Sequence, residues 1–323
     1  MYWIKDKKQP LLVICGPTAS GKTAVGAAAA KELDGEVISA DSMQLYKGME
    51  IASAAPTEEE MLGVPHHLIG ILDIDEKFSA ADYARTARET VNETAARGKL
   101  PVIVGGTGLY IDSLINNINF EPSASDGSVR RELEKLAAIN GKAYMMELLR
   151  KYDPQAAEKL HENNLVRVIR AIEMYRLTGR TFEENMKLSR ERESPYEVCM
   201  IGLTFADRKD LYERIDTRVD IMIKNGMLDQ AEELYRSGKM RTAAQAIGYK
   251  EFIPYFEGTA SLDECIGKIK QVSRNYAKRQ LTWFRHNTQI QWIIREKYEQ
   301  NDKIIEKFLN IVAKSEIMCY NKK

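Results

Sequence analysis

The chain has 323 residues, and its 47 Lys or Arg residues balance 47 Asp or Glu residues, so the formal net charge is zero. A content of 44% hydrophobic and 29% charged residues is typical of a globular protein and excludes disordered and fibrous classes. No apolar run approaches the roughly 18 residues of a membrane-spanning helix, and the polar N-terminus lacks the pattern of a signal peptide. We therefore expect a cytoplasmic protein without membrane association, acting as a monomer.

The first third of the chain alternates short apolar runs with helical patterns. The predicted strands are 11–15, 36–40, 66–72 and 101–104, and the predicted helices are 23–33 and 79–97, the second with Ser79 as its N-cap. This alternation predicts an α/β fold with a parallel sheet core flanked by helices.

The pattern changes near residue 121, beyond which no strand is indicated until residue 196. Helical periodicity occurs at 129–149, 155–160 and 165–177. A strand is then predicted at 196–205, followed by helices at 207–225, 228–237, 243–256 and 262–285, a last strand at 289–294 and a C-terminal helix from 297. We infer a discontinuous core domain, 1–120 with 196–323, and an all-helical insertion domain, 121–195.

The four cysteines are far apart and form no CxxC pair. Disulfide and zinc frameworks are therefore not expected, and the cysteines are interpreted as packing residues. The adjacent His66 and His67 lie on a predicted strand and so point in opposite directions, which excludes one shared metal ion and favours structural roles.

The first predicted strand leads into a phosphate-binding loop. The residues that match GxxxxGK[ST], between a strand and a helix, are Gly16, Pro17, Thr18, Ala19, Ser20, Gly21, Lys22 and Thr23. Backbone N–H groups of such a loop surround a diphosphate, while Lys22 reaches the outer phosphate and the Thr23 hydroxyl holds Mg²⁺. The loop does not identify the ligand. A guanine-reading NKxD is absent, and Asp73 is the only, poor, candidate for a Walker-B aspartate.

Residues at the carboxyl ends of the predicted strands should meet at the same edge of the sheet. Asp41 follows one strand, with Ser42 and Gln44 beside it, and is interpreted as a metal ligand, a general base or a simple turn cap. The turn Gly105–Gly108 follows another strand, and Thr107 within it caps the next helix.

Arg218 lies on the apolar stripe of the helix predicted at 207–225, together with Leu211, Ile215 and Met222. Such an arginine either extends along the edge of the core or points into the ligand crevice. The residues alone favour neither position.

Charge is polarised along the sequence. Seven acidic and no basic residues lie within 50–76, whereas seven basic and no acidic residues lie within 265–295. A local basic segment binds nucleic acid although the whole protein is neutral, because screening limits each phosphate contact to about 10 Å. The alternative is that the two segments face each other.

Seven ordered motifs resemble one family over nearly the whole chain. They are Gly16–Thr23 (GPTASGKT), Asp41–Tyr46 (DSMQLY), Val64–Ile69 (VPHHLI), Gly105–Tyr110 (GGTGLY), Arg167–Glu173 (RVIRAIE), Ala246–Phe252 (AIGYKEF) and Ala277–Arg285 (AKRQLTWFR). The chain resembles the bacterial tRNA dimethylallyltransferases, also called tRNA isopentenyltransferases, which implies a core like that of P-loop NTPases. The implied reaction transfers a dimethylallyl group from dimethylallyl diphosphate to the N6 amine of the adenosine beside the anticodon and releases diphosphate.

The resemblance also implies roles for individual residues. The phosphate loop, Mg²⁺ on Thr23 and Arg218 would neutralise the departing diphosphate, and Asp41 would act as the base at the amine. The target adenine would be flipped into a channel opposite the donor. The implied tRNA contacts, at the anticodon stem-loop, are Asp41, Ser42, Met43, Gln44, Thr107, Arg130, Arg167, Arg170, Arg274, Lys278 and Arg279.

The basic segment combines positive charge with Trp283 and Phe284, which suits RNA backbone and unstacked bases. A helix with Trp283 in the core is the plainer interpretation. Two positions depart from the family pattern: Ala52–Pro56 replaces Gly-Thr-Ala-Lys-Pro, and Asn164 replaces an aspartate. The rival functions are a nucleoside or nucleotide kinase of the same fold and a non-catalytic RNA-binding ATPase.

Overall fold

The computed structural model describes residues 8–120, 127–238, 246–296 and 299–317. Contacts divide the chain into two compact units, 1–115 with 194–323 and 116–193. These divisions lie a few residues from the predicted boundaries at 121 and 195. Among the described residues no helix has the length and apolarity needed to cross a membrane.

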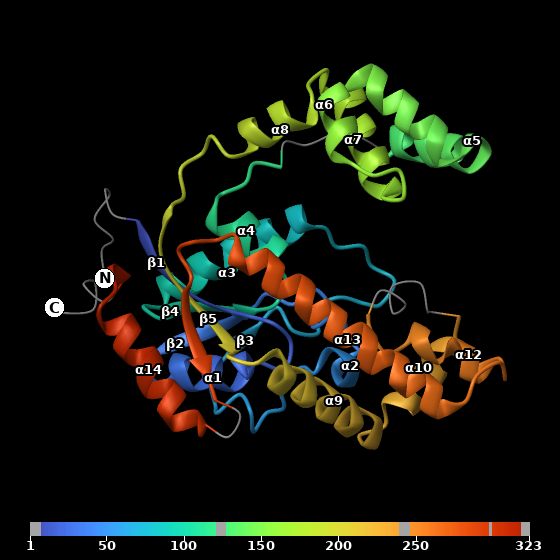
Figure 1. Ribbon diagram of the computed structural model, residues 1–323. Helices are drawn as coiled ribbons and strands as arrows, with labels where there is room; N and C mark the ends of the chain where they lie inside the picture. Colours follow the sequence, from blue (N-terminus) through green and yellow to red (C-terminus); the bar gives the residue numbers. More distant parts are fainter. Residues whose placement is uncertain (1–7, 121–126, 239–245, 297–298, 318–323) are drawn as a thin grey trace. The chain divides into compact units, whose positions relative to one another are not determined.

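The larger unit is built on a six-stranded sheet in which every neighbouring pair of strands is parallel (Figure 1). The strand order is β3-β2-β4-β1-β5-β6. The strands are β1 (Gln9–Cys15), β2 (Gly35–Ser39), β3 (His66–His67), β4 (Leu100–Gly105), β5 (Tyr196–Phe205) and β6 (Gln291–Arg295). The predicted α/β class is confirmed, and a parallel sheet of this kind requires apolar cover on both faces.

Alternating side chains of the central strands enter two separate cores. Leu12 and Ile14 of β1 pack on one face with α1 (Lys22–Glu32) and α14 (Asn301–Ala313). Leu11 and Val13 pack on the other face with α3 (Ala80–Ala96) and α4 (Gly108–Ile115). The helices that complete this unit are α2 (Glu50–Ser53), α9 (Arg208–Lys224), α10 (Met227–Arg236), η1 (Lys250–Phe252), α12 (Ile253–Phe256) and α13 (Leu262–Arg285).

The described residues of the smaller unit form helices and connecting segments and include no strand. Its helices are α5 (Ser128–Tyr152), α6 (Pro154–Lys159), α7 (Leu165–Thr178) and α8 (Phe182–Ser189). They enclose their own core, in which Leu133 and Leu149 of α5 pack against Ile172 of α7. The backbone of Gly141, with φ of 76°, interrupts α5. A separate core of this kind is what an inserted domain needs to be stable.

Two of the predicted elements are wrong. The strand predicted at 66–72 ends after His67, because Leu68 and Gly70 have φ values of 60° and 59° that an extended strand does not allow. The helix predicted at 243–256 begins outside the described residues. Its described part is broken at Gly248, where φ is 115°, and only the short helices η1 and α12 follow.

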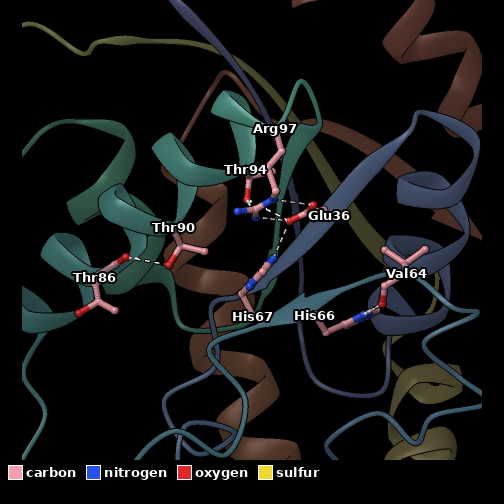
Figure 2. A network of polar contacts seen from close by, with 8 residues as sticks. All are labelled: Glu36, Val64, His66, His67, Thr86, Thr90, Thr94 and Arg97. Carbon is pink, nitrogen blue, oxygen red and sulfur yellow. Dashed lines mark hydrogen bonds and ion pairs between the residues drawn. The ribbon is translucent and has the colours of Figure 1, made fainter.

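A buried carboxylate joins β2, β3 and the end of α3 (Figure 2). Glu36 accepts hydrogen bonds from Arg97 at 2.5 and 3.1 Å, from His67 at 2.7 Å and from Thr94 at 3.3 Å. His66 points the other way and its Nδ1 lies 2.8 Å from the Val64 carbonyl. The opposite orientations predicted for the two histidines are thus confirmed.

Glu36→Gln is expected to destabilise the protein by about 2 kcal/mol at pH 7, because Arg97 loses its charged partner. The hydrogen bonds from Arg97, and those from His67 after them, lower the pKa of Glu36 from 4.5 to about 2 against the effect of burial. A depressed carboxyl pKa stabilises the fold above pH 4.5, and this contribution is lost as the pH falls toward 2. Denaturant unfolding of both proteins at several pH values measures the difference.

The matched control is Asp34→Asn, which removes an exposed carboxylate that pairs with Lys99 at 2.5 Å. Exposed pairs of this kind contribute less than about 1 kcal/mol. A stability difference between wild type and Glu36→Gln that stays constant from pH 7 to pH 3 would contradict the prediction.

Candidate functional site

The phosphate loop connects β1 to α1 at the carboxyl edge of the sheet. A Cβ on Gly16 would lie 2.4 Å from the Leu203 carbonyl oxygen, and one on Gly21 would lie 2.3 Å from the Arg295 guanidinium. Both glycines also have positive φ values, of 145° and 88°. Glycine is therefore the residue that fits these two positions. Because the N-cap residue Gly21 has no side chain, the N–H groups in the first turn of α1 receive no side-chain cap and can bind an anion.

Three consecutive loop residues are held by side chains from the C-terminal third of the chain. The Thr18 N–H donates to Gln280 Oε1 at 2.8 Å, Arg214 Nε donates to the Ala19 carbonyl at 3.2 Å, and Arg295 Nη1 donates to the Ser20 carbonyl at 3.1 Å. The loop is therefore fixed by residues 195 to 275 positions away in sequence.

Lys22 is only 9% exposed, and its ammonium donates to the Pro17 carbonyl at 3.2 Å. Burial and, less strongly, the charge of Arg218 lower the pKa of Lys22 to about 8, while the carboxylate of Asp41 acts in the opposite direction. Burial also lowers the pKa of Arg218, and Asp41 opposes this too. Lys22 is buried and Arg218 is partly buried, so an anionic ligand bound between these cations would offset the effect of burial on both.

A cavity of about 270 Å³ lies beside the loop, within the larger unit. It brings together many of the predicted site residues, namely Thr18, Lys22, Thr23, Asp41, Ser42, Met43, Gln44, Arg218 and Arg279. Its apolar lining includes Ile215 and Met222 of α9 and Ile269 of α13. Of the two positions that the sequence left open for Arg218, the edge of the core and the ligand crevice, the structure shows the crevice.

The segment Asp41–Gln44 forms a compact turn after β2. Asp41 Oδ1 accepts the N–H of Met43 at 2.9 Å, and Gln44 Oε1 accepts the Ser39 hydroxyl at 2.7 Å. Asp41 therefore caps a turn, as one of its three interpretations predicts, and it also lines the cavity. Its roles as a metal ligand or a general base stay predictions.

The glycine turn after β4 packs directly against this segment. Thr107 Oγ1 accepts the N–H of Ser42 at 3.1 Å, and the Thr107 N–H donates to the Ala40 carbonyl at 3.0 Å. A Cβ on Gly105 would lie 2.2 Å from that same carbonyl oxygen, which explains the glycine. Thr107 does not itself line the cavity but fixes the turn that carries Asp41.

The basic segment on α13 is partly neutralised by α9. Arg274 Nη1 donates to both carboxylate oxygens of Asp216 at 2.6 and 2.7 Å, and Lys270 pairs with Asp220 at 2.6 Å. These partners come from α9 rather than from the acidic stretch 50–76. Lys278 is exposed on the same helix.

The aromatic residues of this segment divide between surface and core. Trp283 is 40% exposed and donates to Asp112 at 2.8 Å, whereas Phe284 is 1% exposed. The interpretation that places Trp283 in the core is wrong, because the buried face of this helix contains the next residue, Phe284.

The predicted arginines of the insertion lie on α5 and α7. Arg130 and Arg170 converge on the buried Glu173, at 3.6 and 2.8 Å, and Arg167 is exposed one turn away. The contact of these three arginines with RNA stays a prediction.

Sequence reasoning missed several residues around the cavity. His66, Lys250 and Tyr276 line the cavity, and Gln280 and Arg295 form hydrogen bonds with the phosphate loop. His66, Lys250 and Gln280 stood inside quoted motifs, so the signal was present without a role attached.

The structure also bears on the kinase alternative. Asp73, the candidate Walker-B residue, lies outside every described strand, has a side chain 76% exposed and pairs with Lys47 at 3.0 Å. It is therefore far too exposed to act as a buried metal ligand behind the loop.

Comparison with known proteins decides the family. Residues 44–287 match the sequence profile described as IPP transferase. The chain belongs to the IPP transferase family. Curated relatives of this family named tRNA dimethylallyltransferase include one from Thermoanaerobacter sp., 44% identical over 94% of this chain and 97% of the relative, and one from Bacillus subtilis, 45% identical over 97% and 100%.

Solved structures of IPP transferases agree. A tRNA isopentenylpyrophosphate transferase from Bacillus halodurans is 45% identical, covers 95% of this chain and 96% of its own, and has a TM-score of 0.72. A eukaryotic dimethylallyltransferase described as acting on tRNA is 26% identical with a TM-score of 0.80, over 95% of this chain and 80% of its own. The family resemblance and its P-loop type of core are confirmed, and these relatives do not support a kinase.

Proposed function

We propose that this protein is a tRNA dimethylallyltransferase that joins a dimethylallyl group to the N6 amine of the adenosine beside the anticodon. The observation that carries the proposal is one cavity that is lined by Lys22, Thr23, Arg218 and Asp41 together with apolar side chains. The proposed reaction requires a binding site for the diphosphate, an apolar site for the five-carbon chain and a group that accepts a proton.

The chemistry follows from the charges in the cavity. The amine nitrogen attacks the first carbon of the dimethylallyl group while the bond from that carbon to the diphosphate oxygen breaks. Lys22 and Arg218 stabilise the negative charge that develops on diphosphate, each such contact contributing on the order of 3 kcal/mol. Asp41 accepts the proton that the amine releases, which compensates for the weak nucleophilicity of an adenine amine.

A divalent cation fits the loop, and we infer that it is Mg²⁺. Thr23 and Asp41 both line the cavity, and both have side chains with oxygen atoms. Mg²⁺ prefers oxygen ligands and is commonly held by one or two protein groups together with substrate phosphates. Bound on Thr23, it would neutralise charge on the diphosphate.

The remaining assignments rest on the family and on placement. We infer that the predicted insertion domain, 121–195, holds the anticodon stem through Arg130, Arg167 and Arg170, and that Ser42, Met43, Gln44 and Thr107 serve the anticodon loop. The protein would act as a monomer in the cytoplasm, where its tRNA substrate is made. Of the two departures from the family pattern, Ala52–Pro56 contributes Ala52, Ser53 and Pro56 to the cavity lining, whereas Asn164 is the N-cap of α7 in the smaller unit.

The proposed function is tested by incubating an unmodified tRNA transcript with the protein, Mg²⁺ and dimethylallyl diphosphate. Mass spectrometry of the nucleosides should show one adenosine gaining a dimethylallyl group, and the gain should disappear when the adenosine beside the anticodon is replaced. Phosphate transfer from ATP to a nucleoside, with no prenylated adenosine, would establish the kinase instead.

Lys278→Ala is expected to weaken tRNA binding and to lower the slope of log affinity against log salt by about 1, because it removes one exposed positive charge from α13. Arg274→Ala is expected to act in the same direction with a smaller change in slope, because Arg274 is already paired with Asp216. Filter binding over a range of about 50 to 300 mM salt measures this slope. Lys303→Ala is the control, since this exposed lysine lies on α14, a helix that packs against the other face of the sheet. An unchanged slope in both α13 variants would remove this segment from the RNA interface.

A further inference from the structure

Gln280 connects the two halves of the proposed site without touching the cavity. Its Oε1 accepts the N–H of Thr18 in the phosphate loop at 2.8 Å, and its Nε2 donates to the carbonyl of Gly106 in the glycine turn at 2.9 Å. The side chain is only 5% exposed and is absent from the cavity lining. The amide of Gln280 is therefore hydrogen-bonded to the phosphate loop through its oxygen and to the glycine turn through its nitrogen.

The glycine turn carries this connection on to the acceptor side. Thr107 follows Gly106 and accepts the N–H of Ser42, the residue after Asp41. Tyr276, one turn before Gln280 on α13, lines the cavity itself. The hydrogen bonds of Gln280, the peptide bond between Gly106 and Thr107, and the hydrogen bond from Ser42 thus connect the phosphate loop to the segment that holds the proposed base.

The fit around Gln280 is close at the glycine turn. A Cβ on Gly106 would lie 2.2 Å from Gln280 Nε2, whereas the nearest atom of any other residue, the Gly16 carbonyl oxygen, would be 3.4 Å away. No positive φ accompanies Gly106. Room for the Gln280 amide therefore accounts for the glycine at this position.

We propose that Gln280 is a positioning residue that sets the distance between the diphosphate cradle and the turn carrying Asp41, so that donor and acceptor are held in reacting geometry. The proposal rests on the proposed function for the identity of the two substrates. A small displacement of either loop would separate the reacting atoms, and rates are sensitive to misplacement of about 1 Å.

Gln280→Met keeps the length of the side chain but removes both hydrogen bonds and leaves the Thr18 N–H without its partner. We expect the dissociation constant for inorganic pyrophosphate with Mg²⁺ to rise about tenfold, since a buried donor is left unpaired. We expect kcat for prenyl transfer to fall by a further factor of about 10 to 100, while the tRNA dissociation constant stays within about twofold. Calorimetry, steady-state kinetics and filter binding give the three quantities.

The matched control is Gln271→Met, the same substitution at an exposed position of α13. It should change none of the three quantities. If Gln280→Met lowers only the unfolding temperature, with pyrophosphate affinity and kcat equal to those of the control, Gln280 is a packing residue and the proposal is overturned.

A double-mutant cycle tests the same contact from its other end and does not depend on how well Gln280→Met folds. Gly106→Ala alone should raise the pyrophosphate dissociation constant by about the same factor as Gln280→Ala, because its methyl group displaces the amide. The double variant should be no worse than Gln280→Ala, since the shorter side chain leaves room for the methyl group. Additive losses in the cycle would overturn the proposal.

Pyrophosphate binding separates this proposal from the proposed function. If the wild-type protein prenylates no tRNA, the proposed function fails, and the pyrophosphate cycle alone then decides whether Gln280 positions the loop. If the wild-type protein is active but the cycle is additive, the function stands and the positioning role does not.

Discussion

Asp41→Asn is expected to lower the rate of prenyl transfer by a factor of about 10² to 10⁴ while tRNA binding stays within about twofold of wild type. The amide oxygen of asparagine still accepts the N–H of Met43, which Asp41 Oδ1 accepts at 2.9 Å, so the turn keeps its shape. What is lost is the ability to take the proton from the amine. Single-turnover rates with saturating donor, alongside filter binding of tRNA, separate the two effects.

A matched control for this variant is Asp73→Asn, since Asp73 is highly exposed and pairs only with Lys47 in the ion pairs of the described residues. Its transfer rate should equal that of wild type. Loss of tRNA binding together with activity in Asp41→Asn would make Asp41 a recognition residue. An Asn variant as fast as wild type would exclude Asp41 from proton transfer and would favour a non-catalytic role for the turn.

Elements with strong local signals could be predicted to within a residue or two. The strand at 196–205 and the helix at 262–285 have the predicted bounds, and Ser261, the N-cap of this helix, forms a capping box with Glu264. The third strand was too long because positive φ values at Leu68 and Gly70 depend on the packing of the following turn. Apolar periodicity carries no information about such a backbone reversal.

Within the site, the sequence predicted the residues that directly follow strands but not the residues that contact the site from distant positions in the chain. Lys22 and Asp41 stand next to predicted strands, so sheet topology alone brings them to one edge. Gln280 and Arg295 reach the loop from α13 and β6, across 262 and 275 positions. No local pattern specifies which turn of a long helix faces a loop, and the crevice position of Arg218 was undecided for the same reason.

Lys22→Met is expected to reduce prenyl transfer by a factor of about 10² to 10³ and to weaken pyrophosphate binding, because one of the two cations that face the leaving group is removed. Arg218→Gln should have an effect of similar size. Lys31→Met is the control, since this lysine lies exposed in the last turn of the same helix. Transfer rates of Lys22→Met equal to those of the control would show that the loop lysine does not act on the leaving group.

The same pair of cations predicts the direction of a pH effect. With the pKa of Lys22 near 8 in the free protein, the ammonium is charged below pH 8, and above pH 8 anion binding must be accompanied by proton uptake. Pyrophosphate affinity should therefore decline above pH 8 relative to Lys22→Arg, whose guanidinium stays charged. Because the charge of Arg218 lowers the pKa of Lys22, the decline in Arg218→Gln should begin at a higher pH. The ionisation of pyrophosphate is common to all three proteins and cancels in the comparison, so identical pH profiles would mean that Lys22 does not titrate in the site.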